Sequence, residues 1–549
     1  MNDTFDILII GGGIVGAGAA RDAAMRGLQT CLVEQRDIAF GTSSRSSKLV
    51  HGGLRYLEQG ELSLVFEAVS ERRVLMDIAP HLVVPLGFLF PVYKHSRRGV
   101  FTVNIGMWLY DGLSLFRSPK IHRNLSPDEV RREEPTLRSQ DLRGAPLYYD
   151  CATDDARLTL ENAIDATANG AVLHTWTRVI GMSHDAGGRV HGVRVRDAHS
   201  GEEREISAKV VLNCTGAWTD MTRALAGQAQ PLLRPTKGVH IVVDRRRLPV
   251  NTAVVCFHPE DGRVVFAIPW GDHTYIGTTD TDEPVDPALV AASSTDVAYL
   301  LNAGNHYFPG ANLTAEDVLS TWAGLRPLIA HTGSASSVSR EHEIVVEPDG
   351  MLTIAGGKLT TYRRMAAELV DRAVSLLKLS GQVRATRDAR TDQRALPGGV
   401  GWPEDDDRGR VVKLIQEAGP VDEPTARLFC DTYGMRGIEV AARIQENAAL
   451  GAALVEGRPE RLAQVDWGVE KELARTVCDV LIRRTQLYYR DTEQGLGAVD
   501  RVADRMAGLL GWSADRRLQE VMAYQEEVAR SRSWRATSGS GPSFTRPAD

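Results

Sequence analysis

Apolar and polar positions in the first 34 residues follow the pattern of a strand, a glycine turn, a helix and a second strand. Residues 5–10 (FDILII) form a short run rich in β-branched side chains, which is typical of a strand buried on both faces. An alanine-rich stretch then continues to Arg26 and stops at Gly27, which predicts a helix closed by a glycine. A second apolar run, residues 30–33, ends at Glu34. This order predicts the opening unit of a doubly wound parallel sheet.

The turn between this strand and helix has the form G-x-G-x-x-G. Gly11 permits a tight turn, Gly13 lets the backbone approach a pyrophosphate, and Gly16 lets helix and strand pack closely. The unpaired N–H groups and the positive end of the helix dipole favour phosphate binding there. Glu34 follows Gly11 by 23 residues (34 − 11), where an acid binds the ribose hydroxyls of an adenosine. The stretch therefore predicts a dinucleotide site, for either NAD or FAD.

Two further regions carry strand patterns, and a third is helical. A β-meander is predicted before the buried strand 209–212, which ends in the small residues of 213–218. Antiparallel strands are then expected near 252–258, 263–269 and 274–278. A second strand–glycine–helix junction is predicted from Met351 to Arg363, where a helix N-terminus can support negative charge on a reduced flavin. A linker at 395–399 precedes patterns that are almost wholly helical to about Arg530.

Composition narrows the class of protein. The net charge of −7 argues against general nucleic-acid binding. The six cysteines are scattered without a C-x-x-C pair, which favours a reduced compartment and offers neither a zinc nor an iron–sulfur framework. The first strand begins within five residues, which leaves no room for a signal peptide, and no apolar run is long enough to span a bilayer. We therefore expect a cytoplasmic protein with no metal site.

One segment suggests contact with a membrane surface. Residues 82–123 contain two apolar and aromatic stretches, 86–90 and 100–116. The cations that flank them are Lys94, Arg97, Arg98, Arg117, Lys120 and Arg123. Such a segment can lie in a membrane interface with its cations near anionic headgroups, or it can be an ordinary core helix with solvated ends.

The stretch after Glu34 is rich in hydroxyl groups, GTSSRSSKLVHGGLRYLE from Gly41 to Glu58. By composition it suits phosphate and flavin-edge contacts, or it is a flexible surface loop. The stretch closely resembles the corresponding part of FAD-dependent glycerol-3-phosphate dehydrogenases, which are membrane-associated respiratory flavoenzymes. The opening IIGGGIVGAGAARDAAMRGL is similar too, as are later blocks that include WAGLRPL and GGKLTTYR. The resemblance runs from about Asp6 to the region of Arg484.

The resemblance implies a glucose-oxidase-like FAD-binding α/β fold with a doubly wound parallel sheet, an antiparallel substrate-domain sheet and a helical C-terminal domain. The implied domains are 1–80, 150–230 and 325–390 for FAD binding, 81–149 and 231–324 for substrate binding, 395–530 for the helical domain, and 531–549 for a disordered tail. The tail is rich in Ser, Gly, Pro and Arg, which favours disorder.

The implied activity is oxidation of sn-glycerol 3-phosphate to dihydroxyacetone phosphate. The flavin N5 accepts a hydride, while the protein supplies a base and positions the substrate. By resemblance Arg326 binds the phosphate, Arg55, Tyr56 and Lys358 lie near the flavin and the substrate oxygens, and His240 is the candidate base. Alternatively, Arg55 or Lys358 lowers the hydroxyl pKa by stabilising the alkoxide. The residues implied for cofactor binding are Gly11, Gly13, Gly16, Glu34, Thr42, Ser43, Ser47, Lys48, Thr215, Gly216, Gly357, Leu359 and Thr360.

The resemblance implies non-covalently bound FAD, a membrane quinone as electron acceptor, and peripheral attachment to the inner face of the cell membrane. Three other hypotheses stay open. A glycerophosphate oxidase would pass electrons to oxygen, a related amine or hydroxy-acid oxidase would turn over substrates without phosphate, and a non-catalytic flavin- or nucleotide-binding module would not be reduced by substrate. Homodimer formation is also left open, and no nucleic-acid partner is expected.

Overall fold

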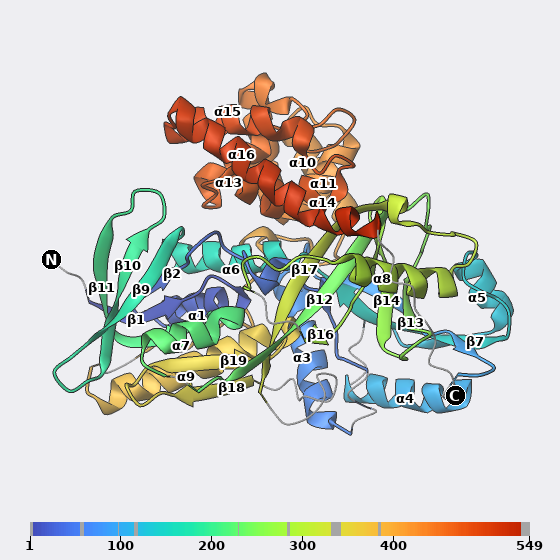
Figure 1. The fold of residues 1–549 in the computed structure, drawn as a ribbon, viewed down its shortest axis with the longest axis horizontal. Helices are drawn as coiled ribbons and strands as arrows, with labels where there is room; N and C mark the ends of the chain where they lie inside the picture. Colours follow the sequence, from blue (N-terminus) through green and yellow to red (C-terminus); the bar gives the residue numbers. More distant parts are fainter. Residues whose placement is uncertain are drawn as a thin grey trace.

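The computed structural model describes residues 4–54, 57, 60–96, 98–114, 119–228, 230–282, 286–330, 342–382 and 386–539. Within these ranges the chain forms two sheets side by side and a helical domain above them (Figure 1). The predicted architecture of a parallel sheet, an antiparallel sheet and a helical C-terminal domain is confirmed.

The first sheet contains the N-terminal strand at its centre. Among the described residues it has eight strands, which in spatial order are β18 (His342–Val346), β19 (Leu352–Gly356), β11 (Glu203–Asn213), β1 (Phe5–Ile10), β2 (Thr30–Val33) and β8 (Val172–His174), with β10 (Val190–Asp197) and β9 (Thr177–His184) joined to β11 as the predicted meander. Strand β1 is parallel to both of its neighbours, β2 and β11. Because helices or strands cover both faces, Ile7, Leu8 and Ile9 are fully buried, as a continuous apolar run predicts.

Three helices pack against this sheet: α1 (Ile14–Met25), α6 (Asp155–Ala168) and α9 (Tyr362–Leu379). Small side chains on α1 allow its neighbours to approach closely. A Cβ atom on Gly18 would lie 3.1 Å from the ring of Tyr362 and 3.2 Å from Cβ of Ala366 on α9. The alanine-rich sequence of α1 is therefore explained by packing on both sides of the helix.

The second sheet is mainly antiparallel. Among the described residues it has eleven strands, with the path β16 (Thr281–Asp282), β12 (Leu233–Asp244), β15 (His273–Gly277), β14 (Val264–Trp270), β13 (Ala253–Phe257), β4 (Val84–Leu89), β7 (Leu142–Ala152) and β3 (Leu49–Val50), while β17 (Val318–Ile329) pairs with β12, and β5 (Val92–Tyr93) and β6 (Arg123–Leu125) pair with β7. The register between β12 and β17 places His240 opposite Trp322 and Gly238 opposite Gly324. This pairing decides which side chains meet at the site described below.

The remaining helices lie beside one of the two sheets or build the C-terminal domain. Those before residue 390 are α3 (Leu62–Ile78), α4 (Val100–Leu113), α5 (Pro127–Glu133), α7 (Thr219–Leu225) and α8 (Ser294–Tyr307). The C-terminal domain contains α10 (Arg408–Ala418), α11 (Glu423–Tyr433), α12 (Gly437–Glu446), α13 (Ala463–Lys471), the π-helix η8 (Asp479–Arg484), α14 (Leu487–Arg490), α15 (Val499–Leu510), α16 (Ala514–Ser531) and the 3₁₀ segment η10 (Ser533–Gly539).

The structure differs from the sequence-based boundaries in two respects. Helix α16 includes Ser531, and Trp534 in η10 is buried in the core of the second sheet, so the expected disordered tail does not begin at 531. Strand β3 and most of β17 beyond residue 324 belong to the second sheet, although the predicted division places both in the FAD-binding domain. The physical reason is that β17 keeps its pairing with β12 through to Ile329, and the two residues of β3 pair with the end of β7.

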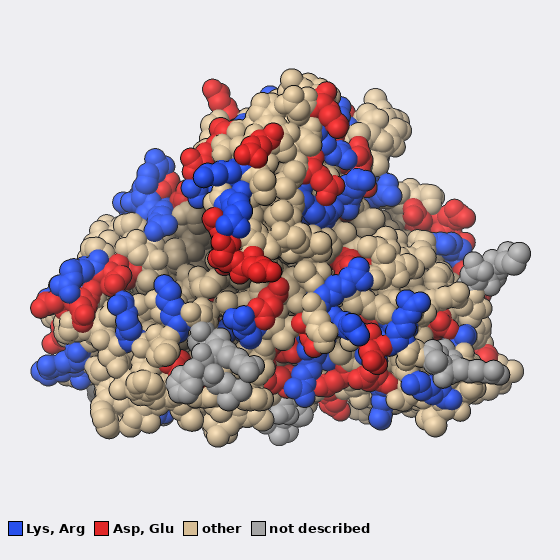
Figure 2. Space-filling model, turned by 180° about the vertical axis from the view of Figure 1, so that it is seen from behind, with Lys and Arg blue, Asp and Glu red and all other residues tan. Residues whose placement is uncertain are grey.

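Charged side chains are interspersed on the face seen in Figure 2. Lys and Arg alternate with Asp and Glu there, in keeping with the small net charge of −7. Among the described residues, no helix combines the length and the apolar character needed to cross a bilayer.

Candidate functional site

The turn between β1 and α1 has the geometry of a phosphate cradle. Gly11 has φ of +108°, a conformation that side chains rarely adopt, and Gly13 is the N-cap of α1. A Cβ atom on Gly16 would lie 1.9 Å from the carbonyl oxygen of Gly11. Helix and turn can approach this closely only because Gly16 has no side chain. The start of α1 therefore lies close against the turn, and a helix N-terminus in this position favours an anion, as the motif predicts; of its N–H groups, that of Ile14 donates to Ser43 Oγ.

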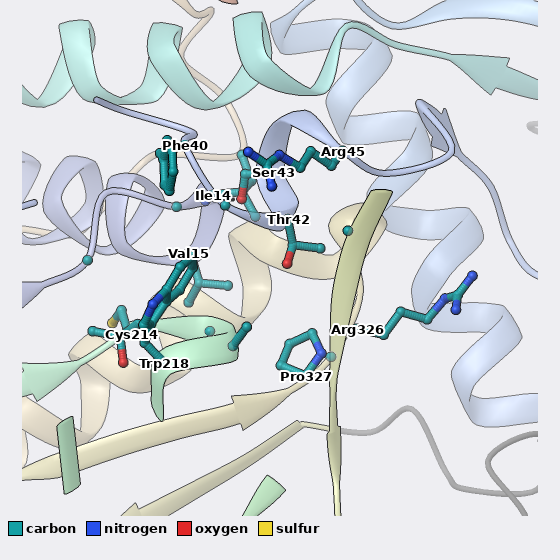
Figure 3. A pocket seen from close by; sticks show the side chains of 18 of the residues that line it. Ile14, Val15, Phe40, Thr42, Ser43, Arg45, Cys214, Trp218, Arg326 and Pro327 are labelled. Carbon is teal, nitrogen blue, oxygen red and sulfur yellow. Dashed lines mark hydrogen bonds between the residues drawn. The ribbon is translucent and has the colours of Figure 1, made fainter. Parts of the chain in front are cut away.

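A cavity of about 720 Å³ extends from this cradle, within the usual range for cofactor pockets. Figure 3 shows Val15, Cys214 and Trp218 at one end and Arg326 with Pro327 on β17 at the other. The loop after β2 forms a further wall. The elongated shape suits a dinucleotide whose phosphates lie at the cradle and whose ring system reaches β17.

Side chains of the loop wall are fixed by local hydrogen bonds. Glu34 accepts hydrogen bonds from the backbone N–H groups of Gly12, at 2.7 Å, and Arg36, at 2.8 Å. Burial raises the pKa of its carboxyl group above the ordinary value. Ser43 Oγ accepts from the N–H of Ile14 at 2.9 Å, and Thr42 Oγ1 donates to Leu325 O at 2.6 Å. These bonds tie the loop to the helix on one side and to β17 on the other.

Arg326 and His240 line the opposite end of the cavity, and Lys358 lines the same cavity. The Arg326 guanidinium donates to Asp280 Oδ1 at 3.1 Å and to Thr278 Oγ1 at 2.9 Å, which holds it in place while part of the group stays exposed. Gly238 lies directly beside it, since a Cβ there would be 2.6 Å from Arg326 Nη2. Lys358 precedes the short helix at the start of α9. Cations from two distant segments thus line one cavity.

His240 lies on β12 near Arg326 and is 2% exposed. Its ring stacks on Trp322, with centroids 4.7 Å apart and planes 15° apart, and its Nε2 lies 2.9 Å from Ser47 Oγ. Burial lowers the pKa of His240 well below its ordinary value, and the charges of Arg326 and Lys48 lower it further. The imidazole is therefore neutral at physiological pH and can accept a proton.

The side chain of Lys48 forms a buried ion pair beneath the hydroxyl-rich loop. Its Nζ lies 2.6 Å from Asp155 Oδ1 in a buried ion pair, and the ammonium group faces the aromatic rings of Trp270, Trp322 and Tyr489. It is not part of the cavity wall. The expected contact between Lys48 and the cofactor stays a prediction, while the side chain itself pairs with Asp155 away from the cavity. Two other predicted site residues, Arg55 and Tyr56, lie outside the described residues.

The other predicted cofactor residues line the cavity from two separate segments. They are Thr215 and Gly216 after β11, and Gly357, Leu359 and Thr360 after β19. Gly216 and Gly357 have positive φ values of 55° and 82°. Thr360 Oγ1 accepts a hydrogen bond from the N–H of His51 at 3.1 Å.

Several cavity residues were not predicted from the sequence, among them Arg45 and His51. Arg45 lies in the cavity wall, with its guanidinium carbon 5.3 Å from the centre of the Phe40 ring, and His51 lies at the start of the glycine pair 52–53. Both are within the hydroxyl-rich stretch that resembles the flavoenzymes. Their position in that stretch was the available signal, but composition alone does not separate cavity-facing side chains from their neighbours.

Replacing Gly16 with alanine is expected to abolish cofactor retention. The added Cβ would overlap the Gly11 carbonyl, so the turn and α1 must separate and the phosphate cradle is lost. The ratio of flavin to protein absorbance in the purified variant measures this. Gly508→Ala, in α15 where no atom lies within 4 Å of the added Cβ, is the control and should keep its flavin. Full flavin content in Gly16→Ala would contradict the cradle.

Comparison with known protein families identifies two matching regions. The family described as FAD dependent oxidoreductase matches residues 6–404, and the family described as C-terminal domain of alpha-glycerophosphate oxidase matches residues 389–517. The chain is 38% identical over 515 residues to the aerobic glycerol-3-phosphate dehydrogenase of Staphylococcus saprophyticus, which covers 93% of this chain and 91% of the relative. A relative with the same description from Staphylococcus epidermidis is 37% identical over 532 residues, covering 96% of this chain and 94% of the relative.

Solved structures support the same assignment. The glycerol-3-phosphate dehydrogenase from Bacillus halodurans, complexed with FAD, aligns with a TM-score of 0.80 at 32% identity, covering 99% of this chain and 97% of that chain. The L-alpha-glycerophosphate oxidase from Mycoplasma pneumoniae, with FAD bound, aligns with a TM-score of 0.54 at 18% identity, covering 71% of this chain and 98% of that chain, and shows a shared fold.

The cradle fits the cofactor of this family, because Gly11, Gly13 and Gly16 leave room for the pyrophosphate and Glu34 stands at the position of a ribose ligand. The cofactor is FAD. From the family matches, the identity to curated relatives and the full-length structural alignment together, the chain belongs to the FAD-dependent glycerol-3-phosphate dehydrogenase family.

Proposed function

We propose that this protein oxidises sn-glycerol 3-phosphate to dihydroxyacetone phosphate. The observation that carries the proposal is a single cavity that joins the dinucleotide cradle at Gly11 and Gly13 to the cations Arg326 and Lys358. A secondary alcohol that carries a phosphate needs such cations at one end and a hydride acceptor beside its carbon. Bound FAD supplies that acceptor.

Arg326 is proposed to bind the substrate phosphate. Its guanidinium is held by Asp280 and by the side chain of Thr278, so the fork is already oriented before substrate arrives. A planar fork suits the oxygens of a phosphomonoester. Lys358 is proposed to stabilise the developing alkoxide, and Arg55, outside the described residues, stays a second candidate for that task.

His240 is proposed to be the general base. Its neutral imidazole lies at the cationic end of the cavity, and its ring is held by stacking on Trp322. Because burial and two cations lower its pKa, the rate of flavin reduction should stay flat from pH 8 down to pH 6.5 and fall only in more acidic solution. Stopped-flow measurement of flavin reduction across this pH range checks that the rate falls only on the acidic side. His240→Ala should reduce slowly at every pH.

The visible spectrum of the purified protein tests the proposed reaction. Adding glycerol 3-phosphate without oxygen should bleach the flavin bands, whereas glycerol without phosphate should bleach them far more slowly. A spectrum unchanged by glycerol 3-phosphate would remove the proposed activity. Rapid bleaching by an amino acid or a hydroxy acid would favour the related oxidases instead.

The electron acceptor is proposed to be a membrane quinone. A second candidate is oxygen, because the C-terminal region matches the family described as C-terminal domain of alpha-glycerophosphate oxidase. Turnover with a soluble quinone analogue under anaerobic conditions, measured beside peroxide formation in air, separates the two. Quinone reduction without peroxide supports the dehydrogenase.

Membrane contact is proposed to occur through the apolar outer face of α4. Four large side chains on this face are exposed, namely Phe101, Ile105, Trp108 and Leu109. Their spacing of three and four residues places them on one side of the helix. At the N-terminal end of the neighbouring helix α3, Leu62 and Phe66 are exposed as well, and both helices lie along the lower edge of the molecule in Figure 1. An apolar face of this kind, with Lys94 and Arg98 before it, suits a lipid interface with anionic headgroups.

Replacing Phe101 and Trp108 with serine is expected to release the protein from vesicles that contain anionic lipid. These side chains are 76% and 54% exposed, so their loss should cost little stability while removing most of the apolar contact. Vesicle co-sedimentation measures binding. The matched control is Leu518→Ser with Met522→Ser on α16, two other exposed apolar side chains. Equal binding of both double variants would contradict the assignment to α4.

A further inference from the structure

The ring nitrogens of His240 have unequal surroundings. Nε2 lies 2.9 Å from Ser47 Oγ, whereas Nδ1 is buried and has no hydrogen-bond partner among the described residues. The ring is stacked on Trp322 and meets Tyr275 edge-on, with centroids 6.0 Å apart, so neighbouring side chains oppose its rotation. A proton that reaches this imidazole from the cavity would therefore arrive at Nε2, by way of Ser47.

Two side chains of the second sheet hold the backbone at Ser47 in position. The hydroxyl of Tyr275 donates to Ser47 O at 2.9 Å, and the indole of Trp322 donates to Ser46 O at 3.0 Å. The next residue is Lys48, whose ammonium group is paired with Asp155. These contacts fix the backbone on both sides of Ser47, and its side chain forms part of the cavity wall. The serine hydroxyl thus contacts the histidine while lining the cavity.

We propose that Ser47 is a catalytic residue that relays the proton of the substrate hydroxyl to His240. The proposal rests on the proposed function and deepens it. The substrate O–H bond breaks as its proton moves to Ser47 Oγ, while the original Ser47 proton moves to the lone pair of Nε2. The substrate carbon loses a hydride to the bound flavin, and its C–O bond becomes the carbonyl. The serine is regenerated, and the histidine retains one proton.

Substrate binding itself assists this transfer. The charge of Arg326 is one of the causes that depress the pKa of His240. A phosphate dianion bound to Arg326 offsets that charge, so the imidazole becomes a stronger base only when substrate is present. The base is thereby activated by the same group that gives the substrate its specificity.

The test compares Ser47→Ala with Ser47→Thr by anaerobic stopped-flow reduction at saturating FAD. Ser47→Ala should reduce about 100-fold more slowly than the unmodified protein, within the range that general acid–base groups contribute. Its apparent affinity for glycerol 3-phosphate should be unchanged, because the contact with Arg326 is intact. Ser47→Thr, which keeps a hydroxyl, should recover most of the rate. Ser320→Ala, which removes a buried serine hydroxyl bonded to Tyr489 O, controls for a general loss of stability.

Three readouts separate a relay from a structural role. Because two protons move in the relay, the rate of flavin reduction should depend on the fraction of heavy water along a curve. In Ser47→Ala this dependence should become linear. The combined Ser47→Ala and His240→Ala variant should be no slower than the slower single variant, because the two groups act as a unit. The FAD content and thermal midpoint of Ser47→Ala should match those of Ser320→Ala.

Reduction of Ser47→Ala at the unmodified rate would overturn the relay. So would a defect that excess FAD repairs, since Ser47 would then be a cofactor contact alone. These outcomes are distinct from failure of the proposed function, in which the unmodified protein itself is not bleached by glycerol 3-phosphate.

Discussion

Replacing Arg326 with alanine is expected to raise the KM for glycerol 3-phosphate at least 100-fold while the flavin stays bound. Hydrogen bonds to charged groups contribute about 1.5–3 kcal/mol each, so loss of a two-pronged contact to a phosphate corresponds to roughly two or more powers of ten in affinity. Arg326 lies at the end of the cavity away from the Gly11 cradle, which is why cofactor retention should be unaffected. Steady-state kinetics and the flavin absorbance ratio measure the two quantities.

Two further variants sharpen this result. Arg326→Lys keeps the positive charge but not the planar two-pronged group. Its KM should therefore lie between that of Arg326→Ala and that of the unmodified protein. Arg234→Ala removes an arginine of the same sheet that is paired with Asp282 at the surface, and it should leave KM unchanged. An unaltered KM in Arg326→Ala would remove this residue from the phosphate site, and loss of flavin would place it at the cofactor instead.

Replacing Asp37 with alanine is expected to loosen the C-terminal domain from the cofactor domain and to release FAD. Asp37 accepts a two-pronged contact from Arg484, with both N–O distances 2.8 Å, and a third bond from Arg483. All three side chains are buried. Breaking a buried ion pair by removing one partner costs about 3–5 kcal/mol, because the remaining charges stay desolvated. In Asp37→Ala, Arg483 and Arg484 of the π-helix η8 would lose the carboxylate that they share.

The effect on FAD follows from the position of Asp37 in the chain. It lies three residues after Glu34, and Ala39 donates its N–H to the Gly12 carbonyl at 3.0 Å, so the same loop forms part of the cradle. Thermal unfolding followed by flavin fluorescence, together with limited proteolysis between the domains, measures both consequences. Glu203→Ala, which breaks an exposed pair with Arg196, is the control and should shift the midpoint little. A Tm for Asp37→Ala equal to that of this control would show that the pair does not hold the domains together.

Prediction from sequence and the structure agree best for elements that are decided by a short segment of the chain. The strand, glycine turn and helix from Phe5 to Met25 could be predicted because residues only a few positions apart decide them. The same holds for the antiparallel strands β13, β14 and β15, whose turns are marked by glycine, proline and aspartate. Trp534 shows the limit, since a composition typical of disorder does not reveal that one aromatic side chain fits into a distant core.

By itself, the sequence was enough to predict the family and the dinucleotide cradle, because both depend on local motifs; the roles of the cations stay predictions. Only the tertiary structure decided how those residues work together. Ser47 and His240 are 193 residues apart and Lys48 and Asp155 are 107 apart, yet both pairs are in hydrogen-bond contact. The pairing of β3 with β7 places Leu49 opposite Ala152 and so brings Lys48 near Asp155, while β12 carries His240 to the loop at Ser47. Neighbouring residues of one loop therefore differ in role: Ser47 lines the cavity beside the histidine, while Lys48 holds the loop through a buried carboxylate.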